Sequence, residues 1–423
     1  MKRIAFVTLA LFTLSCSDSK KTTPDAHLTA ELRNLYTSKQ YFDLRDVLEG
    51  WDRDSSSTVL FYRGVVDNKF HRPESSVRYL QAYVSQAENE ADVDLLIDGY
   101  EILADNFLKM HRYKEASETF GTILSTFGSH LDPEQVADFE NSFTMCDALR
   151  DVPPQTAVIQ GETKLQTTDG YLPVRINDRD LLLGPDTGAN FSVIIRSLAE
   201  KADMRIIDVS VDVLNVAGMK VVARLGVASR VEIGKVVLHN VVFLVFDDKD
   251  LYIPGADLQI KGVIGFPVIE ALGEITFGRN GEVLIPAEPR KHSIHNMCLD
   301  GLTPLIAGIF RGNRHTFCLD SGAGTSTLYP SFFKAYEEEI EANYSASIEK
   351  VRGFGGYREI PAYRMENVRM TFSEKEIFFK EIPVLTEYTL DNSHYFYGNL
   401  GRDMIHQFER MTLNFASMCF VFE

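Results

Sequence analysis

The sequence predicts a multidomain α + all-β protein, in which a helical-repeat-like N-terminal domain is followed by a bilobal β domain. Apolar residues recur at helical spacing over residues 28–152, where Gly and Pro are scarce. The pair Pro153-Pro154 ends this helical pattern, and short β-rich runs with Gly turns follow it. Two segments of the β-rich half match each other, which predicts one lobe over residues 158–290 and a second lobe over residues 291–423.

The composition is that of a folded globular chain. Its 423 residues are 45% hydrophobic and 24% charged, which excludes a disordered chain and a coiled-coil rod. The formal net charge of -17 argues against a nucleic acid partner, because phosphate binding needs clustered Lys and Arg. Cys298, Cys318 and Cys419 fall in expected strands of the second lobe, where buried free thiols are the favoured reading and a disulfide is the alternative.

The first residues have the pattern of an export signal. A positively charged start precedes an apolar run over residues 4–14 that is too short to span a bilayer. The run ends in Thr-Leu-Ser-Cys at Cys16, which resembles a bacterial lipobox. The resemblance implies that residues 1–16 are a lipoprotein signal peptide, that Cys16 carries lipid, and that the polar residues 17–27 form a tether. We therefore expect a protein exported to the bacterial cell envelope and held on its membrane by the lipid alone, on the periplasmic or outer-membrane face. The alternative is an ordinary signal peptide cleaved nearby.

One stretch of the helical half, residues 95–124, carries the pattern of a repeat. Ala104 and Phe107 lie on one expected helix, and Ala116 and Phe120 lie on the next. Small residues at matched places let two helices pack closely while the aromatic rings fill the remaining space. The pattern is similar to a tetratricopeptide unit, which implies a surface that binds a peptide or a protein partner. The alternative is a helical spacer or prodomain.

The two matching segments of the second half share a motif. Each reads as a strand, a polar turn, a second strand and then Asp-(Thr/Ser)-Gly-Ala; the first copy spans residues 172–194 and carries Asp186, and the second spans residues 304–328 and carries Asp320. Further along each copy comes a short step that ends in Gly and leads into a helix-like stretch. These steps are Val263-Ile264-Gly265 and Asn399-Leu400-Gly401. Two copies with the same surroundings are hard to explain by chance.

These paired motifs resemble the aspartic peptidase superfamily, with its retropepsin-like and pepsin-like branches. The resemblance covers residues 158–423 and implies a pepsin/retropepsin-like fold of two β-barrel lobes. It also implies an aspartic endopeptidase whose substrate is an extended peptide or an unfolded protein segment. Retropepsin-like chains carry one copy and dimerise, whereas pepsin-like chains carry two copies. Since this chain carries two, we expect it to complete its site as a monomer.

The chemistry explains why two aspartates are needed. Hydrolysis of a peptide bond without a metal requires an activated water and a proton donor. Two neighbouring carboxylates supply both, because like charge raises the pKa of one carboxyl and leaves the other ionised. The resemblance gives Asp186 and Asp320 these catalytic roles. We expect no cofactor and no metal, since no Cys/His spacing in the sequence resembles a zinc site.

The residues after each Asp are expected to support it. Gly188 and Gly322 allow a tight turn whose amides face the carboxylates. Thr187 and Ser321 carry hydroxyls that can hold the two Asp loops together across a local two-fold axis.

The next position of each loop bears on the pH optimum. Ala189 and Ala323 stand where pepsin-like enzymes carry a hydroxyl residue. Since this hydroxyl is missing, we expect a raised pKa for the carboxyl pair and a milder pH optimum than that of gastric pepsins.

Glycines at two hairpins resemble flap tips that close over a bound peptide. They are Gly218 in the first lobe, and Gly355 and Gly356 in the second. The alternative is a pair of ordinary hairpin turns.

One departure from the family pattern favours a different function. Pro185 precedes Asp186 where the family has an apolar residue that can donate to a sheet, so the first Asp loop is expected to be distorted. A distorted loop would favour a non-catalytic, peptide-binding lipoprotein that keeps the protease fold. A third reading is a processing enzyme whose helical domain occludes the cleft.

Overall fold

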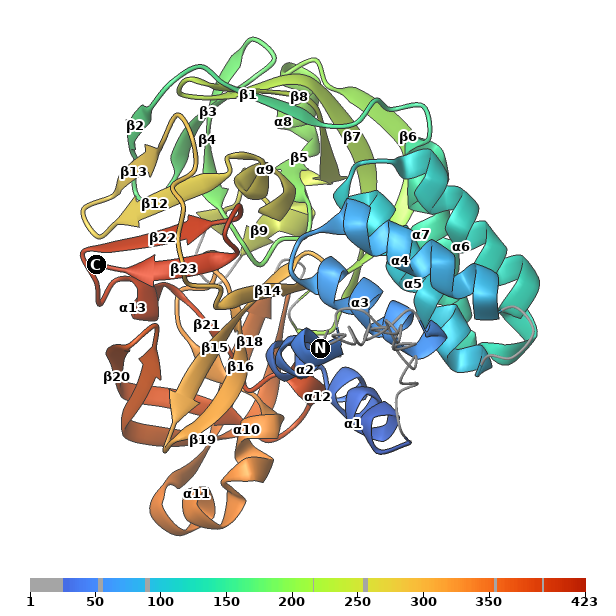
Figure 1. The fold of residues 1–423 in the computed structure, drawn as a ribbon. Helices are drawn as coiled ribbons and strands as arrows, with labels where there is room; N and C mark the ends of the chain where they lie inside the picture. The colour runs from blue at the N-terminus through green and yellow to red at the C-terminus, as the bar shows by residue number, and fades with distance from the viewer. Residues whose placement is uncertain are drawn as a thin grey trace, which may run out of the picture.

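A helical domain flanks a pair of β lobes, and a small sheet joins the lobes on the side away from the helices (Figure 1). The computed structural model describes residues 26–51, 56–87, 92–215, 217–253, 258–353, 356–389 and 392–423. The expected lipidation site Cys16 and the flap candidate Gly355 lie outside these residues. Within them, no helix combines the length and the apolar character needed to cross a membrane.

Helical hairpins build the N-terminal domain. Its helices are α1 (Ala26–Thr37), α2 (Tyr41–Leu48), α3 (Ser57–Lys69), α4 (Pro73–Ala87), α5 (Val93–Lys109), α6 (Tyr113–Phe127) and α7 (Pro133–Leu149), with short 3₁₀ turns η1 (Glu49–Trp51) and η2 (Gly128–His130). Ala104, Phe107, Ala116 and Phe120 are buried where α5 packs on α6, as the sequence predicts. The first helix begins at Ala26, inside the stretch expected to be a tether.

Three of the described hairpin turns have the same geometry. Lys39, His71 and His111 follow α1, α3 and α5 and adopt φ values of 51°, 57° and 54°. The next amide then donates to a carbonyl five residues earlier, which closes the end of the helix. These bonds are Gln40 N to Leu35 O (2.8 Å), Arg72 N to Asp67 O (2.7 Å) and Arg112 N to Phe107 O (2.8 Å). The hairpins are thus repeats of one local structure.

The first lobe is a closed sheet. Its described strands run in the order β1-β8-β5-β11-β4-β3-β7-β6, and an additional pairing of β7 with β8 closes the ring. The elements are β1 (Thr156–Ile159), β3 (Leu172–Ile176), β4 (Arg179–Pro185), β5 (Ser192–Ile195), α8 (Arg196–Lys201), β6 (Arg205–Leu214), β7 (Lys220–Ile233), β8 (Val236–Phe246), η3 (Asp248–Leu251), β9 (Tyr252–Ile253), β10 (Leu258–Gln259), β11 (Gly262–Ile264) and α9 (Phe266–Ala271).

The second lobe repeats this topology. Its described strands run in the order β14-β15-β16-β21-β17-β20-β19-β18, and a pairing of β15 with β19 closes the ring. The elements are β14 (Met297–Asp300), β15 (Thr303–Phe310), β16 (Asn313–Leu319), β17 (Thr327–Leu328), α10 (Pro330–Ala335), α11 (Glu337–Asn343), β18 (Ser345–Gly353), β19 (Gly356–Phe372), β20 (Lys375–Leu385), α12 (Asn392–Tyr395), β21 (Gly398–Leu400) and α13 (Arg402–Ile405). The duplication inferred from the sequence is therefore also a duplication of strand order, except that β1 pairs with β8 whereas β14 pairs with β15.

A third sheet joins the lobes. In the described residues its order is β2-β13-β12-β22-β23, with bounds Thr163–Gln166, Glu282–Ile285, Glu274–Gly278, Arg410–Asn414 and Cys419–Phe422. The central pair, β12 and β22, contributes one strand from each lobe, and the hydroxyls of Thr276 and Thr412 meet at 2.8 Å across it. One apolar core runs from Leu172 of the first lobe through Ile275 to Phe422, so the lobes are a single packed body.

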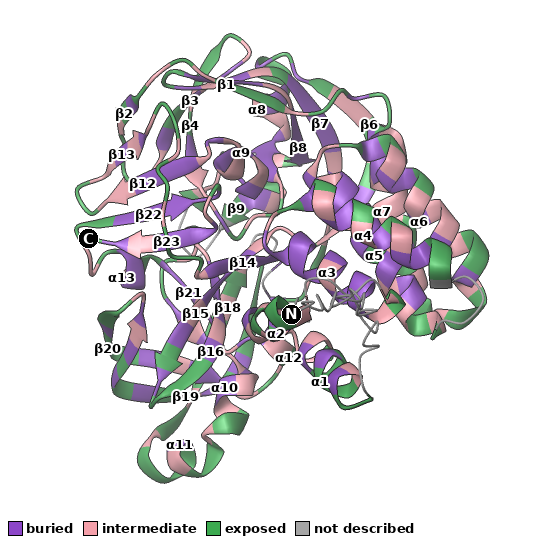
Figure 2. Cartoon of the chain, in the orientation of Figure 1, coloured by how far each residue is buried: buried purple, intermediate pink, exposed green. Residues whose placement is uncertain are grey.

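The helical domain packs against both lobes. Most of α3 is buried because α4 covers one side of it and β14 lies against another, whereas α11 at the far edge is largely exposed (Figure 2). At the other end of the domain, the Asn141 side chain of α7 caps the edge strand β6. Its Nδ2 donates to the carbonyl of Asp212 (2.9 Å), and its Oδ1 accepts from the Asp212 amide (2.8 Å).

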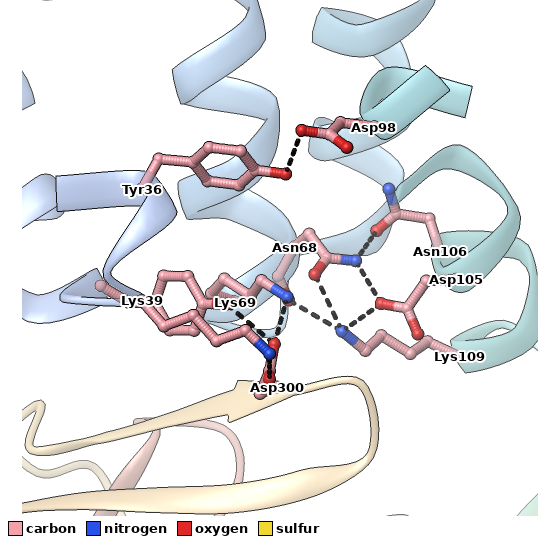
Figure 3. A network of polar contacts seen from close by, with 10 residues as sticks. Tyr36, Lys39, Asn68, Lys69, Asp98, Asp105, Asn106, Lys109 and Asp300 are labelled. Carbon is pink, nitrogen blue, oxygen red and sulfur yellow. Dashed lines mark hydrogen bonds and ion pairs between the residues drawn. The ribbon is translucent and has the colours of Figure 1, made fainter. Parts of the chain in front are cut away.

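A buried charge cluster holds the helices to the second lobe. Asp300 ends β14 and accepts hydrogen bonds from Lys39 Nζ (2.9 Å) and Lys69 Nζ (2.8 Å) (Figure 3). It also accepts a hydrogen bond from Tyr41 OH (2.8 Å). We call these four residues the Asp300 clamp. Its side chains are only 9% (Lys69), 12% (Asp300) and 20% (Lys39) exposed. The two lysines lower the pKa of Asp300 far below its ordinary range, so the carboxylate stays ionised.

The described cysteines are buried and free, as the favoured reading of the sequence expects. They are Cys146, Cys298, Cys318 and Cys419.

Candidate active site

The two Asp loops have the same backbone frame. The amide of Asp186 donates to Ile264 O, and the amide of Asp320 donates to Leu400 O, both at 2.9 Å. Pro185 ends β4 in a parallel pairing with Ile264, as Leu319 does with Leu400. The distortion expected from Pro185 is therefore absent, because the amide that anchors the loop belongs to the next residue.

Hydroxyl groups lock the loops together across the local two-fold axis. Thr187 Oγ1 donates to Leu319 O (2.8 Å), and Ser321 Oγ donates to Pro185 O (3.0 Å). Each hydroxyl oxygen also accepts the backbone amide of the opposite loop, from Ser321 N at 3.0 Å and from Thr187 N at 3.1 Å. Both side chains are buried, so these bonds are shielded from water and fix the separation of the two loops.

Each carboxylate turns back onto its own loop. Asp186 Oδ1 accepts from Gly188 N (2.9 Å), and Asp320 Oδ1 accepts from Gly322 N (2.9 Å). The structure thus brings the two predicted aspartates and the two predicted glycines into one site.

The carboxylates also face each other closely. A Cβ placed on Gly188 would lie 2.7–2.9 Å from the carboxyl atoms of Asp320, and one on Gly322 would lie 2.4–2.5 Å from those of Asp186. Each glycine therefore leaves room for the opposite carboxylate.

This close approach gives a testable prediction. Gly322→Ala should lower the rate of peptide cleavage at least about 100-fold, because its methyl group displaces the Asp186 carboxyl from its reactive position. Gly324→Ala is the matched control, since its Cβ would meet only Arg402 Nη2, at 3.8 Å. Comparable activity of the two folded variants in a steady-state assay would contradict the expectation.

The surroundings raise the proton affinity of Asp186 in the pair. Burial, and then the charge of Asp320, raise the pKa of Asp186 to about 8, although the Gly188 amide opposes the shift. At neutral pH the coupled pair therefore retains one proton.

A cavity of about 700 Å³ opens beside Asp186. Its described lining comes from both lobes and from the joining sheet, and includes Val263, Phe277, Ser321 and Arg402. No lining residue in the described part of the chain belongs to the helical domain. The mixed polar and apolar walls suit a peptide, which offers both backbone amides and side chains.

The flap candidates lie on hairpins that reach across the lobes. Gly218 adopts φ 74° in the β6–β7 turn, and a Cβ on it would lie 2.7 Å from Thr389 O of the second lobe. Gly356 begins β19, and a Cβ on it would lie 2.8 Å from Met219 Cε of the first hairpin. The two hairpin tips therefore meet, and glycine permits their close approach.

One polar residue at the site was not predicted from the sequence. Asn399 Nδ2 donates to Asp320 Oδ2 at 2.8 Å. Asn399 belongs to the Gly-ending step of the second copy, and Val263 holds the matching place in the first. A polar residue in an otherwise apolar step is the signal that could have revealed it.

The alanines of the two loops also differ. Each alanine amide contacts the backbone carbonyl of its own Asp, at 3.4 Å for Ala189 and at 3.2 Å for Ala323, and the Ala323 amide also donates to Asp320 Oδ1 at 2.9 Å. Both loops therefore supply backbone donors to their carboxylates, and Asn399 adds a side-chain donor to the second.

One segment of the chain matches a known protein family. Residues 172–268 match the family model described as aspartyl protease. No curated protein matches the chain. The solved structures that match the chain include a retropepsin-like aspartic protease from Rickettsia conorii. The two sequences are 18% identical, the match covers 31% of this chain and 91% of that chain, and the TM-score is 0.21. The segment around the first Asp loop, from β3 into α9, is thus similar to the aspartyl proteases.

Proposed function

We propose that the chain is an aspartic endopeptidase that builds one active site from both lobes. The observation that carries the proposal is the reciprocal locking of the loops by Thr187 and Ser321, which holds Asp186 and Asp320 face to face. The substrate is an extended peptide or an unfolded protein segment, which the cavity beside Asp186 can accommodate.

The reaction uses the pair as an acid and a base. The ionised carboxylate takes a proton from water, and the water oxygen attacks the scissile carbonyl carbon. The protonated carboxyl donates to the carbonyl oxygen as negative charge develops there. The C–N bond then breaks as a proton passes to the leaving nitrogen, and the pair returns to one proton.

A cleavage map tests this proposal. The full chain is incubated with a mixed peptide library between about pH 3 and about pH 8, and the products are identified by mass spectrometry. Internal cleavages that disappear in an Asp186→Asn, Asp320→Asn double variant are the expected result. A folded wild type that leaves the library intact throughout this range would overturn the proposal in favour of peptide binding without turnover.

The pH dependence follows from the proton on Asp186. Because its pKa is raised to about 8, the Asp186 carboxyl remains protonated in mildly acidic and neutral solution. It loses its proton as the pH rises through that value. kcat/KM should therefore decline on the alkaline side near pH 8 and peak well above the range of gastric pepsins. A pH–rate profile that peaks below about pH 3 would contradict this prediction.

The helical domain is proposed to be a tetratricopeptide-like array with a protein or peptide partner. The shared turns at Lys39, His71 and His111 support this assignment.

The proposed anchor at Cys16 would place the enzyme on the cell envelope. Radiolabelled fatty acid that enters the wild type but not a Cys16→Ser variant would support the anchor.

A further inference from the structure

We propose that Asn399 is a positioning residue that makes Asp320 the ionised, general-base member of the pair and leaves Asp186 as the acid. The inference rests on the proposed function, since it divides the two roles within that site. It starts from a difference between two lobes whose Asp loops are otherwise matched.

The donors to the two carboxylates differ. Asp320 accepts from Gly322 N (2.9 Å), Ala323 N (2.9 Å) and Asn399 Nδ2 (2.8 Å). Asp186 accepts from Gly188 N (2.9 Å) and from the Ala189 amide, and it shares a hydrogen bond with Asp320, but no side-chain amide donates to it among the described residues. Hydrogen bonds to a carboxylate favour its charged form, so the difference stabilises negative charge on Asp320.

Asn399 is the side chain that breaks the symmetry. It lies on β21 beside Cys318, two residues before Asp320, as Val263 lies on β11 beside Gly184, two residues before Asp186. The valine has no donor to offer. An asparagine amide donates at every pH at which the enzyme works, so its effect does not depend on its own titration.

Asn399 also fixes the orientation of the Asp320 carboxylate. The loop amides bind Oδ1, whereas Asn399 binds Oδ2. The carboxylate is therefore held at both oxygens, in one orientation. Such a fixed carboxylate needs no reorganisation when it receives a proton from water.

Other titratable groups near Asp320 do not supply the asymmetry. Burial raises the pKa values of the Cys318 thiol on β16 and of the Tyr329 phenol after β17, so both groups are neutral at working pH. Asp186 lies across the axis as the other member of the coupled pair. Arg402, on α13, lines the cavity beside Asp186, and no ion pair in the described residues engages it.

The matched test exchanges the two lobes' residues. Asn399→Val gives the second lobe the residue of the first, and it should move the acid limb of the kcat/KM profile upward by about one pH unit. Adding Val263→Asn supplies a donor to the other carboxylate. The double variant should recover activity on the acid side, because one carboxylate again carries the extra donor.

A purely structural role for Asn399 would give a different pattern. It would lower kcat by the same factor at every pH, leave the acid limb where it is, and gain nothing from Val263→Asn. An acid limb that does not move in a folded Asn399→Val enzyme overturns the proposal. Asn399→Leu, which is nearly isosteric with the native residue, takes the place of the valine variant if that protein does not fold.

A spectroscopic readout separates this inference from the proposed function. Carboxyl ¹³C titration follows each aspartate without any substrate. If the wild type cleaves no peptide, the peptidase proposal fails. Even then, Asp320 should take up its proton at higher pH in Asn399→Val than in the wild type, and identical titration curves would overturn the role given to Asn399.

Discussion

Asp186→Asn and Asp320→Asn are each expected to lower kcat/KM for peptide cleavage by about 10³-fold to 10⁴-fold. Either change leaves an amide that can neither accept a proton from water nor deliver one to the leaving nitrogen. The carboxylates act as a unit, so the double variant should be little worse than either single variant. Rates are measured by mass spectrometry on one peptide taken from the cleavage map.

The control is the same Asp→Asn substitution at a position outside the active site. Asp178 lies in the β3–β4 turn of the first lobe, and its side chain is 98% exposed. Asp178→Asn should therefore cleave like the wild type. A single variant at Asp186 or Asp320 that retained more than a tenth of the activity would show that one lobe alone suffices. Equal thermal unfolding of all variants would confirm that the chemistry, and not the fold, was lost.

The Asp loops could be predicted from the sequence because the second half of the chain is duplicated. A single Asp-Thr-Gly is common, but Asp186 and Asp320 each follow a strand hairpin and precede a Gly-ending step. The closed rings of strands could not be predicted in detail. The pairing of β7 with β8 and that of β15 with β19 depend on twist and on side-chain packing, which no local pattern records.

Asn399 and Asp300 were missed for different physical reasons. Asn399 has its effect through one hydrogen bond to a loop 79 positions away, inside a step whose other members are core residues. Asp300 is a single acid in a turn-like stretch, and its partner Lys39 is 261 positions away in the chain. Single polar contacts at such separations leave no periodicity in a sequence.

The Asp300 clamp gives the largest expected effect on stability. Asp300→Ala should lower the free energy of unfolding by about 3 kcal/mol, because it removes the counter-charge of the buried Lys69 and of the half-buried Lys39. Most of this loss should come from Lys69, because its side chain is only 9% exposed and its charge would remain buried without Asp300. Chemical denaturation followed by circular dichroism measures the loss. A variant as stable as the wild type would show that the lysines find other partners at no cost.

A second ion pair across the same interface provides the control. Asp43 of α2 pairs with Arg314 of β16, and these side chains are 47% and 41% exposed. Asp43→Asn should lower the free energy of unfolding by less than about 1 kcal/mol, because exposed pairs gain little over hydration. The contrast separates burial from the mere crossing of the interface by an ion pair.

The clamp and the active site respond to pH in opposite ways. The lysines lower the pKa of Asp300, so the stabilisation from the clamp is present above the ordinary range of aspartate and is lost only as the pH falls far below it. Burial and the charge of Asp320 raise the pKa of Asp186, so its carboxyl can donate a proton at mildly acidic pH and loses that proton near pH 8. The wild type should therefore keep its helical domain bound throughout the range in which its catalytic pair is active. Limited proteolysis between about pH 4 and about pH 7 checks this, because Asp300→Ala should release a helical fragment where the wild type resists cleavage.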